Sequence, residues 1–356
     1  MLNKETRNYA YDLLRIFCCL SIICLHVSGH LSWASKYNLL VQGIVRPCLT
    51  TFMTLSGYYV LSKPIVDIKA FYLKKIFFLA FPLVIYAALY QFVPSYISDN
   101  DFLGAIRQIN VISILKTDIC GHFWFVYSLI GLYLATPFLQ KMLSALSNKQ
   151  FVLLLALIFY VERIFPIISQ YNIPALKVDT FPFTGTFVFF YILGFFIRRN
   201  EHIINAKIKL VIIVVGLLNI PFMAYMLTKA PFAATLCNLS LCTIIGTIFY
   251  FVFFSVLPVP EFIGKTVLFF SKRTFSIYLL HMLVFNTMTQ MSFMNLTAEN
   301  KMYMLGIKVF AIFFICALIC SIIDLLIINP VIWLYNQAVD SVLEFFKKLN
   351  RNKNIC

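Results

Sequence analysis

The segment 10–31 is apolar and long enough to cross a bilayer as a helix, yet it contains ionisable side chains. Arg15 and His26 lie 11 residues apart. In a helix this separation is three turns plus about 20°, so both side chains share one face, with a rise of about 16 Å between them. An imidazole can remove a proton from a hydroxyl group at neutral pH, and a guanidinium binds anionic groups. Because ionisable residues in hydrocarbon are costly, this spacing indicates a functional site.

The same face of this predicted helix extends to two more residues. Asp12 precedes Arg15 by three positions, and His30 follows His26 by four. For both Arg15 and His26, a purely structural role also stays open. Arg15 either reaches the headgroups or pairs with Asp12, and His26 makes a hydrogen bond between helices.

A second histidine lies in the apolar segment 268–292. Thr274, Tyr278 and His281 follow i, i+4, i+7 spacing, which places them on one helix face. His281 is therefore either a second functional imidazole or a structural group that orients a partner.

Two further groups lie near the predicted membrane boundaries. His122 and Trp124 begin an apolar run at the outer interface, where an aromatic belt explains Trp124 and where His122 is placed to touch an acceptor. Lys69, Lys74 and Lys75 form a basic patch at the inner face. This patch reflects either the usual excess of cytoplasmic lysine or a site for a phosphate-rich cytosolic ligand.

The composition indicates the class of protein in which these residues lie. Of 356 residues, 61% are hydrophobic and 12% are charged, whereas soluble domains have about 45–50% apolar and about 25% charged residues. These values exclude a water-soluble enzyme, a nucleic-acid-binding domain and a secreted disulfide scaffold. The net charge of +15 fits basic loops beside anionic headgroups better than a nucleic-acid partner. The ten cysteines show no CxxC or CxxH spacing, so no metal site is expected.

Apolar runs of about 20 residues recur along the chain and predict an all-α, polytopic membrane protein with about ten transmembrane helices. Because the connections are short, we expect one membrane-embedded domain over 1–356 and no separate soluble domain. The last run should kink or leave the membrane near Pro330. The ten expected spans are 10–31, 41–62, 71–93, 121–140, 150–166, 182–198, 209–228, 232–256, 268–292 and 304–335.

The loop charges predict the orientation. With the N-terminus inside, the cytoplasmic segments hold 19 Lys and Arg residues and the opposite side holds 8. This bias predicts that both termini are cytoplasmic. The cytoplasmic segments are 1–9, 63–75, 141–149, 198–209, 257–273 and 345–356.

Four segments in this order resemble the integral membrane acyltransferase-3 family. They are YDLLRIFCCLSIICLHV with its Arg-x10-His spacing, IVRPCLTTFMTLSGYYVL, HFWFVYSLIGLYLATPFLQ and FSIYLLH. Members of this family move acetyl or related acyl groups onto surface polysaccharides, antigen lipids and peptidoglycan. The resemblance covers essentially the whole chain, and the second to fourth segments look especially like the O-acetyltransferases of surface-antigen biosynthesis.

The resemblance implies roles for matching residues. His26 corresponds to the catalytic base and Arg15 to the arginine that accompanies it. Lys74 and Lys75 stand where many members carry paired arginines, so the positive charge is kept and the planar fork is lost. Asp12, His30, His122, Tyr278 and His281 are expected to support the site.

The implied reaction takes an acetyl group from cytosolic acetyl-CoA, or a related acyl group from another acyl-CoA, to a hydroxyl of a surface glycan or lipid-linked saccharide. Acyl-CoA, the saccharide and membrane lipids are then the partners, in the cell (inner) membrane, with no permanently bound cofactor. His26 either deprotonates the acceptor or briefly carries the acyl group. Two alternatives stay open: succinyl transfer, and a transporter or flippase of glycans or lipids.

Overall fold

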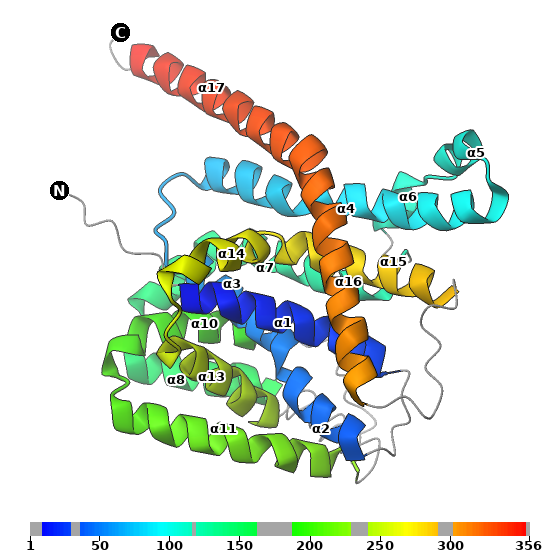
Figure 1. The fold of residues 1–356 in the computed structure, drawn as a ribbon. Coiled ribbons are helices and arrows are strands. Elements are labelled where there is room, and N and C mark those ends of the chain that lie inside the picture. The colour runs from blue at the N-terminus through cyan, green and yellow to red at the C-terminus, as the bar shows by residue number, and fades with distance from the viewer. Residues whose placement is uncertain are drawn as a thin grey trace, which may run out of the picture. The chain divides into compact units, whose positions relative to one another are not determined.

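The protein is all-α in the computed structural model, which describes residues 9–29, 36–115, 119–161, 187–228, 241–290 and 302–353 (Figure 1). These residues form helices and connecting segments without a β-strand. The prediction of an all-α, polytopic membrane protein is confirmed. Large apolar side chains such as Phe314, Leu318 and Leu325 are exposed, as expected for surfaces that face lipid.

The number of long apolar helices is lower than the ten expected. Within the described residues, six helices are long and apolar enough to cross a membrane, or up to seven if α14 and α15, bent by 56°, form one span. The remaining expected spans, 150–166, 182–198 and 232–256, extend into residues outside the described ones. Their described helices are short: α8 (Asn148–Phe159), α10 (Val188–Asn200) and α13 (Leu241–Val256).

The chain divides into two compact units. Unit 1 comprises Met1–Ser62 and Leu143–Ala317, and unit 2 comprises Lys63–Met142 and Leu318–Cys356. The prediction of a single functional domain over the whole chain stays a prediction.

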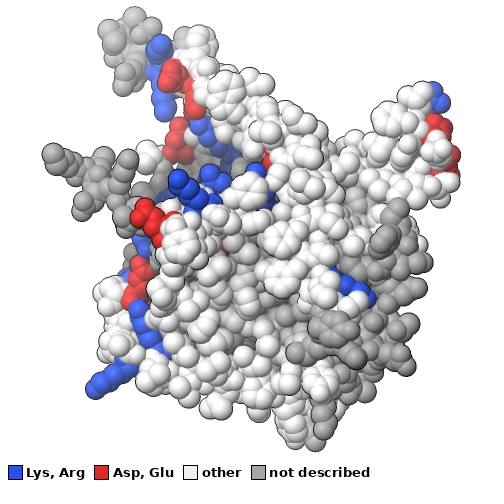
Figure 2. All heavy atoms as spheres, in the orientation of Figure 1, with Lys and Arg blue, Asp and Glu red and all other residues white. Residues whose placement is uncertain are grey.

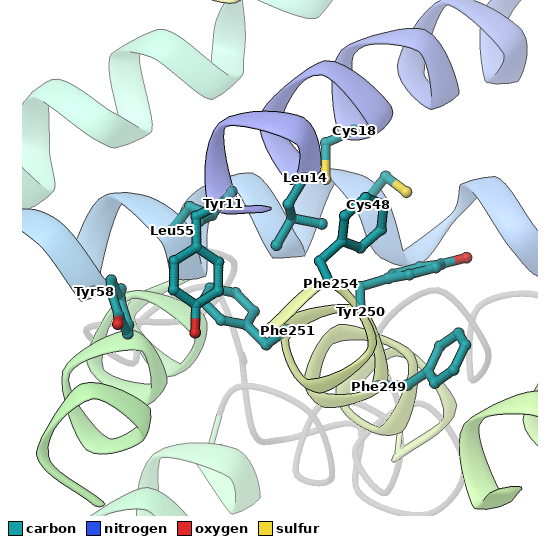
Figure 3. Packing of buried hydrophobic residues seen from close by; sticks show 10 residues of the cluster. All are labelled: Tyr11, Leu14, Cys18, Cys48, Leu55, Tyr58, Phe249, Tyr250, Phe251 and Phe254. Carbon is teal, nitrogen blue, oxygen red and sulfur yellow. The ribbon is translucent and has the colours of Figure 1, made fainter. Parts of the chain in front are cut away.

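Unit 1 is organised around α1 (Tyr9–Ser28), which packs against α2, α3, α13, α14 and α15. Its buried aromatic core combines α1, α3 and α13, with Tyr11, Tyr58 and Phe251 in contact (Figure 3). The other described helices of unit 1, besides α8, α10 and α13, are α2 (Lys36–Val45), α3 (Pro47–Val60), α11 (Ala206–Met226), α14 (Glu261–Ser271), α15 (Thr274–Gln290) and the first part of α16 (Met302–Ile323).

Small residues let α3 and α10 approach closely. A Cβ atom added at Gly57 would lie 1.8 Å from the Tyr191 carbonyl oxygen, and one added at Gly194 would lie 2.0 Å from the Thr54 carbonyl oxygen. Without a hydrophobic force between helices in lipid, such close backbone packing is a main source of association.

Unit 2 contains α4 (Ile68–Asp99), α5 (Phe102–Arg107), α6 (Val111–Leu115), most of α7 (Trp124–Ala145) and the chain after Ala317. A π-helical turn, Asp324–Ile328, leads from α16 into α17 (Asn329–Lys353). Pro330 lacks the N–H group that an α-helix needs at this point, and the wider turn falls where a kink or exit was expected. The Tyr86 hydroxyl donates to Asp324 Oδ1 at 3.4 Å, which gives this buried carboxylate a partner on α4.

Candidate active site

Polar contacts follow the line along which α1 packs against α14 and α15, which we call the seam. The Ser271 hydroxyl donates to Asp12 Oδ1 at 2.7 Å, and the Cys19 thiol lies 3.8 Å from the Thr274 carbonyl oxygen. The residue numbers rise together along both sides, so α1 runs parallel to the α14–α15 pair. The seam therefore presents one face of α1 to one face of α15.

One end of the seam carries a paired charge. Arg15 Nη1 lies 3.1 Å from Asp12 Oδ1, which is the pairing that the sequence left open. Asp12 is buried, whereas 29% of the Arg15 side chain is exposed. The guanidinium also lies over the ring of Tyr59, 4.6 Å from its centroid. These contacts fix the arginine while leaving part of its cationic surface open.

Two histidines meet further along the seam. The rings of His26 and His281 have centroids 5.2 Å apart and planes tilted by 44°. His281 is 1% exposed, and its Nδ1 lies 2.6 Å from the Tyr278 carbonyl oxygen. His26 is partly exposed. The predicted faces of the two helices thus oppose each other, which the sequence alone did not indicate.

Two more residues singled out in the sequence, His122 and Trp124, belong to unit 2. His30 lies outside the described residues. His122 is buried beside Cys120, with its Nδ1 2.9 Å from the Cys120 Sγ. Trp124 is partly exposed, as an interfacial aromatic would be.

The predicted basic patch also belongs to unit 2. Lys74 Nζ lies 2.5 Å from Asp340 Oδ1 on α17, and Lys75 is exposed. Lys347 of α17 lies 3.6 Å from Asp67, the residue that begins α4. Figure 2 shows basic and acidic side chains side by side on this part of the surface. Of the predicted patch, Lys74 thus has an acidic partner, Asp340, which its sequence neighbourhood did not indicate.

Asp67 caps the first turn of α4. Its side chain accepts a hydrogen bond from the Ala70 backbone N–H at 3.0 Å. This hydrogen bond, aided by nearby Lys347, lowers the pKa of the Asp67 carboxyl group.

A group of residues near Arg15 was missed at the sequence level. The Tyr58 hydroxyl donates to Glu201 Oε2 at 2.6 Å and accepts from Arg198 Nη1 at 3.0 Å, while Arg198 and Glu201 form an ion pair at 2.7 Å. Tyr11 packs against Tyr58 with ring centroids 5.1 Å apart. The paired tyrosines of the segment IVRPCLTTFMTLSGYYVL were the available signal.

These features define a class: an all-α membrane protein whose first helix presents an arginine and a histidine along a buried helix–helix seam. The chain belongs to the acyltransferase-3 family, since the family model, described as an acyltransferase domain, matches residues 8–325. The resemblance to the acyltransferase-3 family is thereby confirmed, and the protein is a membrane acyltransferase. No curated protein and no solved structure matches the chain.

Proposed function

We propose that this acyltransferase moves an acetyl or related acyl group from cytosolic acyl-CoA to a hydroxyl of a surface glycan or lipid-linked saccharide. The observation that carries the proposal is the seam, where α1 presents an accessible guanidinium and, about 16 Å along the helix, an accessible imidazole. A phosphate-bearing thioester donor and a neutral hydroxyl acceptor match these two groups.

His26 is the proposed general base. Its imidazole takes the hydroxyl proton, the hydroxyl oxygen attacks the thioester carbonyl carbon, and the carbon–sulfur bond breaks. The proton then passes to the leaving thiolate, which regenerates neutral His26. In the alternative route His26 itself attacks the thioester carbonyl carbon, and the carbon–sulfur bond breaks to release the thiolate. The hydroxyl oxygen then takes the acyl group from the imidazole, and the hydroxyl proton passes to the thiolate. Both routes use the same residue and need no permanently bound cofactor.

Arg15 is the proposed contact for the donor's phosphates. Its ion pair with Asp12 fixes one edge of the guanidinium, and the exposed part remains available to an anion. Lys74 and Lys75 remain proposed acyl-CoA-binding residues of unit 2. Since Lys74 is paired with Asp340, it must exchange that carboxylate for a phosphate.

The proposed orientation has both termini in the cytoplasm and the protein in the cell (inner) membrane. The 19 to 8 distribution of basic residues supports it. Donor and acceptor then meet from opposite sides, because acyl-CoA is cytosolic and the glycan is exported. The extended pantetheine arm of coenzyme A would carry the acyl group along the seam while neither substrate crosses the bilayer.

Sealed inside-out vesicles test the proposal. Labelled acetyl-CoA is added outside, at the cytoplasmic face, with surface-glycan acceptor trapped in the lumen. Label in the lumenal glycan supports the proposal, and its absence from the His26→Ala variant links transfer to the seam. Label only on acceptor added outside would replace it by a one-sided transferase. Glycan movement without labelling would favour the transporter alternative.

A further inference from the structure

The hydrogen-bond partner of His281 determines which of its nitrogens carries a proton. Nδ1 lies 2.6 Å from the Tyr278 carbonyl oxygen, and a carbonyl oxygen can only accept. Nδ1 must therefore be the protonated nitrogen. In neutral His281, Nε2 then carries a lone pair and can accept a hydrogen bond.

A second imidazole near this acceptor belongs to the proposed base, His26. The ring centroids of His26 and His281 are 5.2 Å apart, so nitrogens on the two rings are within reach of a hydrogen bond after small side-chain rotations. The two histidine side chains differ in exposure, and this difference suggests different roles. His281 is 1% exposed and has no direct access for a substrate, whereas His26 is partly exposed.

We propose that His281 is a positioning residue for acyl transfer, accepting the ring N–H of His26 on its Nε2 and thereby directing the other nitrogen of His26 toward the acceptor hydroxyl. The inference rests on the proposed function of His26. It assigns to a neutral imidazole the orienting task that a carboxylate performs in a serine hydrolase triad.

The proposed cycle is balanced in protons and needs no further reactant. Before reaction, neutral His26 donates its one N–H to His281 and presents a lone pair to the hydroxyl. When His26 takes the hydroxyl proton it becomes an imidazolium, and the hydrogen bond to His281 Nε2 strengthens because the donor is now charged. After His26 gives the new proton to the thiolate, the original arrangement returns. His281 gains and loses no proton in the cycle.

Burial explains why this arrangement suits the seam. His281 is buried on α15, which packs against α1, and the Tyr278 carbonyl lies about one helical turn before it on the same helix. Its orientation is therefore fixed by α15 itself, and α15 in turn is fixed against α1 by the Ser271–Asp12 and Cys19–Thr274 contacts. A rigid acceptor on His281 would limit the rotation of the partly exposed His26 ring.

Three variants of the full-length protein test the role: His281→Leu, His281→Gln and, as a matched control on the next residue of α15, Met282→Leu. Purified protein in lipid vesicles is assayed with labelled acetyl-CoA and a surface-glycan fraction. We expect His281→Leu to lower kcat by about 10- to 100-fold, with KM for acetyl-CoA within about twofold of the parent. His281→Gln keeps an acceptor oxygen and should recover a clear part of the lost kcat, while Met282→Leu should behave as the parent.

Solid-state NMR of protein with ¹⁵N-labelled histidine supplies a readout that does not depend on activity. The signal that disappears in His281→Gln should be that of a neutral ring protonated at Nδ1, and the His26 signal should shift in the same variant. A His281 ring protonated at Nε2 would overturn the proposal.

The kinetic outcomes separate the two proposals. Parent protein that transfers acyl groups, with an unaltered kcat in His281→Leu, would overturn the role of His281 alone. Equal loss in the Leu and Gln variants would overturn it too and leave a purely structural residue. Parent protein without any acyl transfer would overturn the proposed function and the positioning role together.

Discussion

The seam of unit 1 and the α4–α17 pair of unit 2 both bring opposite charges together, but in different surroundings. In the seam, the Asp12 side chain is 4% exposed and holds both Arg15 and Ser271. In the α4–α17 pair, 33% of Lys74 and 54% of Asp340 are exposed. Buried pairs are costly to break and fix geometry, whereas exposed pairs contribute about 0–1 kcal/mol and exchange partners easily. The seam is therefore suited to holding reacting groups, and the α4–α17 pair to exchanging a carboxylate for another anion.

The largest expected effect comes from the histidine end of the seam. We predict that His26→Ala lowers kcat for acyl transfer by about 100- to 10,000-fold, because that is the typical contribution of a general base. The amount of protein in the membrane should stay near normal, since His26 is partly exposed and does not fill the core. The measurement is label transfer from acetyl-CoA, normalised to protein in the membrane fraction.

A neighbouring substitution controls for damage to α1. Cys24→Ala changes another partly buried residue of this helix and should retain most of the activity. A well-inserted His26→Ala protein with more than about half of the parent activity would show that the base lies elsewhere.

The arginine end should give the next largest effect. Arg15→Ala is expected to raise KM for acetyl-CoA by about 10-fold or more, since a hydrogen bond to a charged group contributes about 1.5–3 kcal/mol. A smaller rise in KM is expected for Arg15→Lys, which keeps the charge and loses the fork and the planar contact with Tyr59. Steady-state kinetics on protein of equal thermal stability measures both. An unchanged KM with a collapsed kcat would instead place Arg15 at the reacting atoms.

The sequence predicted well what depends on one helix. The Arg15–His26 spacing follows from 3.6 residues per turn, and the expected helix 10–31 agrees with Tyr9–Ser28 within a few residues. Contacts between segments that are distant in the chain could not be predicted from the sequence. His26 and His281 are 255 residues apart, and periodicity alone does not say which helix faces will meet.

Local breaks within a helix were a second feature that the sequence did not predict. The segment 268–292 was expected to be one span, but α14 ends at Ser271 and α15 begins at Thr274. Arg273 Nη1 donates to the Phe269 carbonyl oxygen at 2.8 Å, so the side chain satisfies a backbone group that the end of α14 leaves without a partner in the helix.

The acidic partner of Lys74 was missed for the same reason as the histidine pair, because Asp340 lies 266 residues away along the chain.

The α4–α17 pair should respond more weakly, and in two opposite directions. The double change Lys74→Ala with Lys75→Ala should raise KM for acetyl-CoA about two- to fivefold, because exposed charges contribute little each. Asp340→Asn removes the carboxylate that competes for Lys74 and should leave KM equal or lower. Both effects should shrink at high ionic strength. If Asp340→Asn raised KM as much as the lysine changes, Lys74 would serve the ion pair and not the donor.

The smallest effect is expected at Asp67, where the same comparison can be made through pH. The pKa of this partly exposed carboxyl group is lowered because the folded protein stabilises its charged form, mainly through the Ala70 N–H and also through Lys347. The stabilisation is therefore fully present above the ordinary pKa of 3.8 and is lost as the pH falls through the lower folded value. Asp67→Ala should lower Tm slightly at neutral pH, and its difference from the parent should narrow in strong acid, where the protonated carboxyl group keeps only a neutral capping oxygen. Asp67→Asn keeps a capping oxygen without the charge, so at neutral pH its Tm should lie between those of the parent and Asp67→Ala.

The measurement is the Tm of the three proteins in one detergent. Circular dichroism monitors their thermal unfolding at a series of pH values from neutral to acidic. A difference between Asp67→Ala and the parent that stays constant across that range would contradict the assignment, because a cap that depends on a carboxylate must lose its advantage when the carboxylate is protonated.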